Sequence, residues 1–156
     1  MQSLFKNTSV LNLLEKAVKI QHNEVWKTVF TDDEFDKFIL DLIRIKQLFD
    51  EGIDETGNVI GYYSYMTELL SGGEKIEGTP YTLNDTGEFY KSMNLDVQSD
   101  FFTIDADPLK RDSGGNETNL FTKYGEGIIG LTDENKEILA EEVKERFRNE
   151  LKRLLQ

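Results

Sequence analysis

Thr79-Pro-Tyr-Thr-Leu-Asn-Asp-Thr-Gly-Glu-Phe-Tyr-Lys-Ser-Met93 lies in the middle of the chain, between a helical first half and a segment of short strands. Asn84, Asp85 and Thr86 carry side chains that bond to their own backbone, which indicates a turn or a helix start. Gly87 lets the chain enter that helix without steric cost. This stretch therefore predicts a turn followed by a short helix.

Two segments after this stretch predict an antiparallel hairpin. Residues 95–98 and 101–105 alternate apolar and polar side chains, with residues 99–100 in the turn. Pro108 closes the second strand, because proline cannot donate to the ladder. Residues 110–119 are expected to form a loop.

A helix is predicted before the central stretch. Thr31-Asp-Asp-Glu34 has the spacing of a capping box, in which the Thr31 hydroxyl accepts from the Glu34 N–H. Phe30 and Phe35 are placed to pack across it. An apolar stripe at helical spacing follows, and Gly52 is expected to end the helix. The stripe comprises Phe35, Phe38, Ile39, Leu42, Ile45, Leu48 and Phe49.

Residues 8–29 are also expected to be helical, because apolar side chains recur there at helical spacing. His22 is the only histidine. No nucleophile or carboxylate pattern surrounds it, so it is interpreted as a polar-face residue rather than a catalytic base. Trp26 is expected to anchor the core or an interface.

The segment 53–78 is predicted to hold turns and short extended pieces. Gly57-Asn58 marks a bend, and the acidic residues near it lack the spacing of an EF-hand calcium loop. Tyrosines follow at Tyr62, Tyr63 and Tyr65. Their rigid apolar bodies and polar tips suit an interface, and a surface strand explains them equally well.

A long closing helix is predicted from Thr132, which can cap it. Residues 119–125 before it suggest one or two helical turns stopped by Gly125. The apolar stripe of the closing helix comprises Leu139, Val143, Phe147, Leu151 and Leu154. Basic side chains gather toward its carboxyl end, at Lys144, Arg146, Arg148, Lys152 and Arg153. They suit the helix dipole, and they form either a solvated face or a docking place for a negative partner.

Composition limits the classes of function. The chain has 156 residues, 38% of them hydrophobic, which suits a globular domain with a real core. The formal net charge is −12, so the chain lacks the basic surface that a free nucleic-acid binder needs. The same charge disfavours binding to anionic membrane surfaces. Cysteine is absent, which excludes disulfides. No membrane span or signal peptide is visible, and the lack of cysteine fits a cytosolic folding environment.

Together these elements predict a single α+β domain over residues 1–156, with two N-terminal helices, a small antiparallel sheet and a long C-terminal helix. The helical first part is expected over residues 1–52. Short strands and loops are expected over residues 53–108, and a helical C-terminal part over residues 117–156.

Asp85-Thr-Gly87 is the triplet of aspartic proteases, in which two aspartates share one proton. The chain has one copy, so a protease would have to be a homodimer. The flanking residues differ from those enzymes, because Leu83-Asn84 precedes the triplet and Glu88-Phe89 follows it. A three-residue match is weak evidence, so an enzyme is not expected.

The order of these motifs resembles the phage tail-completion, or virion-morphogenesis, family of head–tail joining proteins. Those proteins carry a Leu-x-x-Thr-Gly-x-Leu-x-x-Ser pattern, followed by a Tyr/Gly segment and a closing helix. The matching residues are Leu83, Thr86, Gly87, Phe89 in place of the family's Leu, Ser92, Tyr124 and Gly125. The likeness covers residues 45–155 and extends to uncharacterised virion proteins of Bacteroidetes-infecting, crAss-like phages. The family's Arg-Pro-Phe segment is missing, and Gly127-Ile-Ile-Gly130 stands in its place.

The resemblance implies a structural protein of the virion neck or tail, made in the host cytoplasm, with no catalytic, cofactor-binding or metal residues. Such proteins form a homo-oligomeric ring, often twelve-fold, that joins the portal or head to the tail. A ring needs two different complementary faces, which we expect at residues 56–81 and near the C-terminal helix. Charge pairing between them would make assembly sensitive to salt. The expected interface residues are Tyr62, Tyr63, Tyr65, Phe89, Tyr90, Tyr124, Arg146, Arg148 and Arg153.

Two other classes of function stay open. A small acidic phage protein could bind and inhibit a basic host protein, since acidity suits mimicry of nucleic acid. The homodimeric aspartic protease is the other, and it predicts loss of activity on Asp85→Asn.

Overall fold

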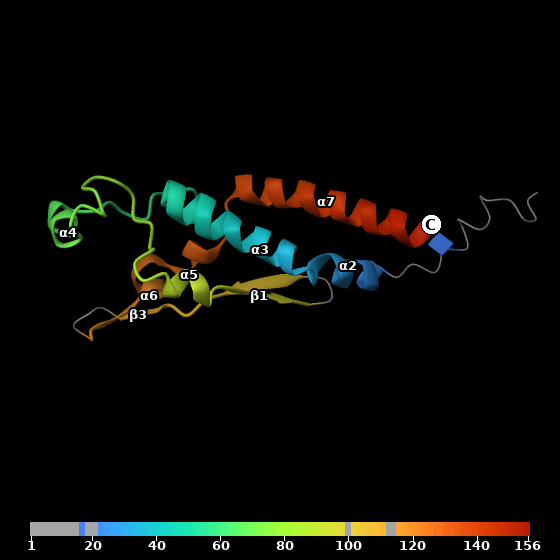
Figure 1. Cartoon of the computed structure of the whole chain (residues 1–156), viewed down its shortest axis with the longest axis horizontal. Coiled ribbons are helices and arrows are strands. Elements are labelled where there is room, and N and C mark those ends of the chain that lie inside the picture. The colour runs from blue at the N-terminus through green and yellow to red at the C-terminus, as the bar shows by residue number, and fades with distance from the viewer. Residues whose placement is uncertain (1–15, 18–21, 99–100, 112–114) are drawn as a thin grey trace, which may run out of the picture.

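The computed structural model describes residues 16–17, 22–98, 101–111 and 115–156, which form an elongated α+β molecule (Figure 1). The predicted fold class is confirmed, with a long C-terminal helix and small antiparallel strand pairs. In chain order the elements are α2 (His22–Phe30), α3 (Asp33–Asp41), the π-helix η1 (Leu42–Glu51), α4 (Tyr65–Leu70), α5 (Glu88–Ser92), β1 (Asn94–Val97), β2 (Phe102–Asp105), β3 (Leu109–Arg111), β4 (Glu117–Asn119), α6 (Leu120–Tyr124), the 3-10 helix η2 (Glu126–Ile129) and α7 (Asp133–Leu155).

Helix α2 is the described end of the helix predicted over residues 8–29. Most of the rest of that prediction, over residues 8–15 and 18–21, lies outside the described residues, as does the side chain of His22. Trp26 is half-buried and stacks on Phe30 with ring centres 4.0 Å apart, so it joins the core as expected.

Helices α3 and η1 form one continuous rod, and its start differs from the predicted capping box. The cap is Asp32, whose carboxylate accepts from the Glu34 N–H at 3.0 Å. The Thr31 hydroxyl instead donates to the Lys27 carbonyl at 2.7 Å, because Thr31 continues the last turn of α2. The predicted contact across this start is present, since the ring centres of Phe30 and Phe35 lie 5.1 Å apart.

The π-helical stretch η1 changes which side chains face the core. A π-helix makes hydrogen bonds between residues five apart, so each turn takes up more residues than an α-helical turn and different positions face the core. Accordingly Leu42 and Ile43 are buried together with Gln47 and Leu48. In this half of the rod the predicted stripe holds at Leu42 and Leu48 but is wrong at Ile45 and Phe49, which are exposed. Gly52 ends the rod in the left-handed conformation with φ of 64°, as predicted.

Helix α7 runs alongside the α3–η1 rod in the opposite direction (Figure 1). Thr132 caps it as predicted, with its hydroxyl accepting from the Asn135 N–H at 3.2 Å. A buried polar network joins this start to η1. The Gln47 side-chain amide donates to the Gly130 carbonyl at 2.7 Å, and its oxygen accepts from the Thr132 N–H at 3.1 Å and the Asn135 amide at 3.2 Å.

Two separate antiparallel hairpins lie on the other side of the rod. Strands β1 and β2 pair with Leu95 opposite Ile104, the register that a turn at residues 99–100 requires. The turn itself lies outside the described residues. Strands β3 and β4 form a second hairpin with Lys110 opposite Thr118. The second hairpin corrects the prediction of a loop over residues 110–119, where three-residue strands leave almost no periodic signal.

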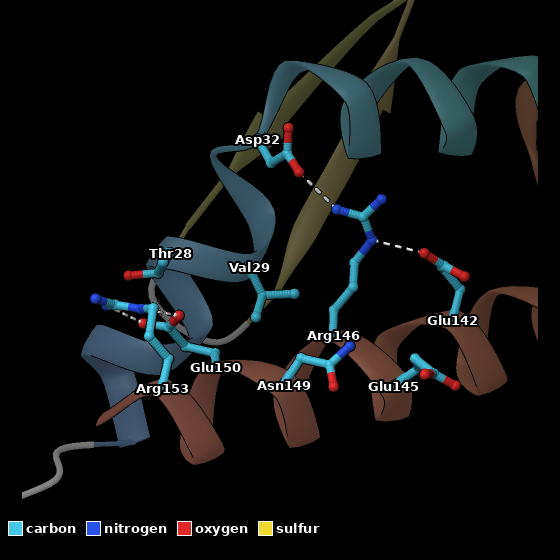
Figure 2. Close-up of a pocket in the computed structure, with 9 residues that line it drawn as sticks. All are labelled: Thr28, Val29, Asp32, Glu142, Glu145, Arg146, Asn149, Glu150 and Arg153. Carbon is cyan, nitrogen blue, oxygen red and sulfur yellow. Dashed lines mark hydrogen bonds and ion pairs between the residues drawn. The ribbon is translucent and has the colours of Figure 1, made fainter. Parts of the chain in front are cut away.

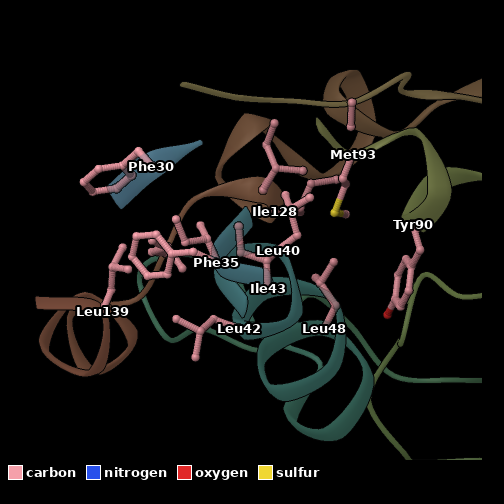
Figure 3. Close-up of a cluster of buried hydrophobic side chains, with 14 of the residues drawn as sticks. Phe30, Phe35, Leu40, Leu42, Ile43, Leu48, Tyr90, Met93, Ile128 and Leu139 are labelled. Carbon is pink, nitrogen blue, oxygen red and sulfur yellow. The ribbon is translucent and has the colours of Figure 1, made fainter. Parts of the chain in front are cut away.

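The core lies where the rod meets α5, η2 and α7 (Figure 3). Phe35, Ile39, Ile43, Leu48 and Ile128 are fully buried there. Burying each such side chain contributes about 1.5–3 kcal/mol, so the α3–η1 rod is the element on which the other elements pack.

Candidate interaction surfaces

A projecting arm, residues 61–81, leaves the body near the end of η1 and carries α4 (Figure 1). Its two sides form a short stem, in which the Tyr63 N–H donates to the Thr79 carbonyl at 3.0 Å and the Gly78 N–H donates to the Tyr63 carbonyl at 2.9 Å. Ser64 caps α4. The strand interpretation holds for Tyr62 and Tyr63, since Tyr62 forms an antiparallel bridge with Pro80, but it is wrong from Tyr65 onward, where α4 begins.

Helix α4 and the turn after it carry large apolar side chains at the surface. The exposed fractions are 62% for Tyr65, 58% for Met66, 62% for Leu69, 80% for Leu70 and 56% for Ile76. Residues four apart on a helix share a ridge, so the first four of these side chains form two adjacent apolar ridges. Contiguous exposed apolar surface of this kind marks interaction sites.

The predicted tyrosines of the arm have different environments. Tyr62 and Tyr65 are exposed. Tyr63 is half-buried, with its hydroxyl 3.2 Å from the Thr82 hydroxyl and its ring edge-on to Tyr81 at 4.9 Å. Tyr63 therefore braces the stem, whereas the other two tyrosines are available to a partner.

Two glycines at the root of the arm, Gly52 and Gly61, allow Pro80 and Tyr81 to pack very close to the backbone. A Cβ on Gly52 would lie 2.4 Å from the Pro80 Cβ and 2.9 Å from the Tyr81 carbonyl oxygen. A Cβ on Gly61 would lie 2.4 Å from the Tyr81 ring. The direction in which the arm leaves the body therefore depends on these contacts.

Asp85 ties the arm to the second hairpin. Its carboxylate oxygens lie 2.7 Å from the Lys75 Nζ and 2.8 Å from the Lys110 Nζ. Hydrogen bonds from Lys110 and Lys75 lower the pKa of Asp85 to about 2. The aspartates of a protease pair must share a proton near working pH, and a carboxylate with two ammonium partners holds its proton poorly. The geometry favours an ion-pair role for Asp85.

Two residues expected at an interface are instead in the core. Phe89 and Tyr90 are each 8% exposed, because α5 turns both rings inward. Burial raises the pKa of Tyr90, and its hydroxyl donates to the Thr82 carbonyl. Tyr124 is half-buried at the end of α6, with its ring 6.1 Å from that of Tyr81. Spacing alone could not distinguish an aromatic core residue from an aromatic contact residue.

A charged cleft of about 460 Å³ lies between α2 and α7 (Figure 2). Arg146 reaches across it, with its guanidinium nitrogens 2.6 Å from Asp32 and 2.7 Å from Glu142. The guanidinium also lies 4.5 Å from the centre of the Phe35 ring. The Glu34 N–H and then Arg146 lower the pKa of Asp32.

The other two predicted arginines also have acidic neighbours in their own chain. Arg153 makes a bidentate pair with Glu150 at 2.6 and 2.7 Å, and an Arg148 nitrogen lies 4.0 Å from Glu145. Both are exposed. Of the three arginines, Arg146 is the one committed to holding the fold, since it joins α7 to the start of α3.

An apolar groove of about 590 Å³ lies between α2, β2 and α7. Of its ten lining residues eight are apolar and two are lysines, Lys136 and Lys144. The main apolar walls are Trp26, Phe30, Phe102, Ile104, Leu139 and Val143. These walls come from three segments far apart in the chain, and for that reason no motif in the sequence indicated the groove.

No group of three metal-binding His, Cys, Asp or Glu side chains occurs among the residues that the structure describes. Within the same residues, no helix has the length and apolar character to cross a membrane. Comparisons with protein-family models, curated proteins and solved structures gave no match.

Proposed function

We propose that this chain is a structural protein of a tailed-phage virion, a neck or tail subunit of a homo-oligomeric ring that joins the portal or head to the tail. The observation that carries the structural role is the arm, which holds an apolar helix away from the body. Exposing Leu69 and Leu70 to water is unfavourable, so a partner that covers them gains free energy from their burial.

The motif behind the family resemblance supports the same proposal. Gly87 has φ of 77°, a conformation that other residues rarely adopt, so the glycine of the motif is needed to enter α5. The Ser92 hydroxyl donates to the Phe89 carbonyl at 2.8 Å and accepts from the Asp107 N–H at 3.0 Å. Gly87 thus begins α5, and Ser92 joins the end of α5 to the connection between β2 and β3, so two residues of the motif have definite structural roles.

The test is the mass of the protein in solution, measured by light scattering across protein concentration and salt, first alone and then with portal and neck proteins. We expect a large ring when these partners are present. The double variant Leu69→Ser/Leu70→Ser should unfold in urea like the wild type, because both side chains are exposed, and should fail to enter the ring.

A matched control is Leu109→Ser, which removes an exposed leucine, 48% accessible, that lies outside the arm. This variant should assemble normally. If the double variant assembles as well as the control, the arm has no part in assembly and the observation that carries the proposal fails.

The net charge of −12 favours one second candidate, a phage protein that binds and inhibits a basic host protein. This candidate predicts a monomer or dimer that ignores portal and neck proteins. It also predicts capture of a basic host protein from a lysate, weakened by high salt.

A further inference from the structure

We infer that α4 on the arm of one copy of this chain docks into the apolar groove of a second copy. The inference rests on the proposed function, because it names the contact by which neighbouring subunits of the ring would hold each other. Three observations carry it: the shape and apolarity of both surfaces, their opposite charges, and their positions in the molecule.

The surface of α4 has the form used in helix-in-groove recognition, in which apolar anchors at i, i+3 and i+4 enter a hydrophobic groove. Tyr65 and Leu69 make one ridge, and Met66 and Leu70 make the next. None of the six residues of α4 is buried in its own chain. All four anchors are therefore available to a neighbour.

The groove is suited to accept such anchors. Its volume of about 590 Å³ lies within the range of about 300–1,000 Å³ that is typical of sites enclosing a ligand. Aromatic side chains, Trp26, Phe30 and Phe102, supply rigid apolar walls. Trp26 and Phe102 are only half-buried, so their remaining surface is free to be covered.

The charges around the two surfaces are complementary. The arm carries Glu68, Glu74 and Glu77 against a single Lys75, and Lys75 is paired with Asp85. The charged side chains that line the groove are Lys136 and Lys144. These lysines pair with Asp133 and Glu141 one turn away, in exposed pairs that are weak enough to be exchanged for acidic groups of a partner.

The positions of the two surfaces require two copies. Helix α4 lies at one end of the elongated molecule, and α2, which forms a wall of the groove, lies toward the other (Figure 1). An arm therefore fills the groove of a neighbour rather than its own. Contacts between two different faces of identical chains generate rings when the rotation closes.

The absence of native cysteine allows a direct test by disulfide cross-linking. Leu70→Cys places a thiol on the arm, and Ala140→Cys places one on an exposed lining residue of the groove. The two full-length variants are mixed in equal amounts under mild oxidation. We expect a covalent dimer that forms much faster in the mixture than in either variant alone. Thr122→Cys, at an exposed position on α6, replaces Ala140→Cys in the control mixture and should give slow, collisional cross-linking.

Reversing the charge beside the groove provides a second readout. The double change Lys136→Glu/Lys144→Glu replaces both lysines of the groove with acidic side chains. Both lysines are exposed, so their loss should leave the fold intact. When added to the Ala140→Cys chain, these changes should slow cross-linking to Leu70→Cys about tenfold, because like charges then oppose docking.

Three results would overturn the inference. Fastest dimer formation by Leu70→Cys alone would mean that arms pair with arms. Cross-linking no faster than in the Thr122→Cys control would mean that arm and groove do not meet. Shielding of the Ala140→Cys thiol from a small reagent in dilute monomer would mean that another segment of the same chain fills the groove.

The outcome is separable from that of the proposed function. A chain that enters a ring with portal proteins, yet gives no arm-to-groove cross-link, overturns this contact alone. A chain that cross-links arm to groove, yet ignores portal and neck proteins, retains the contact and loses the virion role.

Discussion

Replacing Gln47 with leucine should destabilise the protein strongly, although the two side chains are similar in size. Gln47 is fully buried, and its amide group makes three hydrogen bonds at the junction of η1 and α7. Leucine would leave the Gly130 carbonyl, the Thr132 N–H and one Asn135 N–H without that partner. Each buried group left unpaired costs about 1–3 kcal/mol. For three groups we therefore expect a loss of at least about 3 kcal/mol, from a total stability that is about 5–15 kcal/mol for typical domains.

The assay is urea unfolding followed by fluorescence of Trp26, the single tryptophan. Gln98→Leu is the matched control, because Gln98 is exposed and its amide bonds to the exposed Asp96 at 2.8 Å. The control should change the free energy of unfolding by no more than about 0.5 kcal/mol. A double-mutant cycle of Gln47→Leu with Asn135→Ala should show coupling, because the two side chains share a hydrogen bond.

A loss below about 1 kcal/mol for Gln47→Leu, with an unchanged dependence on urea, would refute this reasoning. It would mean that water or a shift of α7 satisfies the three groups, and that the network does not hold η1 against α7.

Three further predictions concern the arm and the charged cleft. Asp85→Asn should lower stability at about pH 7 by about 1 kcal/mol or less, since the ion pairs are partly exposed. The folded pKa of Asp85, about 2, lies below its ordinary value of 3.8, so the extra stability of the wild type is present above pH 3.8 and should shrink as the pH falls toward 2. Urea midpoints of the wild type and the variant across pH measure this difference. A difference that grows as the pH falls would contradict the prediction. Gly52→Ala should lower the free energy of unfolding in urea by about 2 kcal/mol more than Gly57→Ala. Both glycines have positive φ, but only a side chain at residue 52 would meet Pro80 and Tyr81. Equal losses would show that the root of the arm is not tightly packed. Arg146→Met should lower the free energy of unfolding in urea by about 1 kcal/mol at low salt and by less at high salt, because salt screens the ion pairs with Asp32 and Glu142. A loss that is independent of salt would assign the effect to packing on Phe35 rather than to the ion pairs.

Much of the helical structure was predictable because its signals are local. Thr132 caps α7 and Gly52 ends η1 as expected, since a cap depends on hydrogen bonds within a few residues. The register of β1 and β2 was also predictable, because the predicted two-residue turn sets Leu95 opposite Ile104 on one partly buried face.

The candidate surfaces were predictable only in part. The tyrosine-rich segment led to the arm, and Tyr62 and Tyr65 are exposed there. Phe89 and Tyr90 were assigned to an interface but are buried, because an aromatic side chain has the same spacing whether it faces the core or a partner. The apolar groove carries no sequence signal, because three separate segments have to come together before it exists.

By itself, the sequence determined the fold class, the end of the rod at Gly52, the start of α7 at Thr132 and the strands of the first hairpin. These features depend on periodicity and on contacts between near neighbours. Only the tertiary structure decided the π-helical register that buries Gln47 and exposes Phe49, the helix on the arm, and the groove beside α7. These features depend on which surfaces meet after the chain has collapsed. The free energy of such long-range packing is large enough to override the local preference of any short segment.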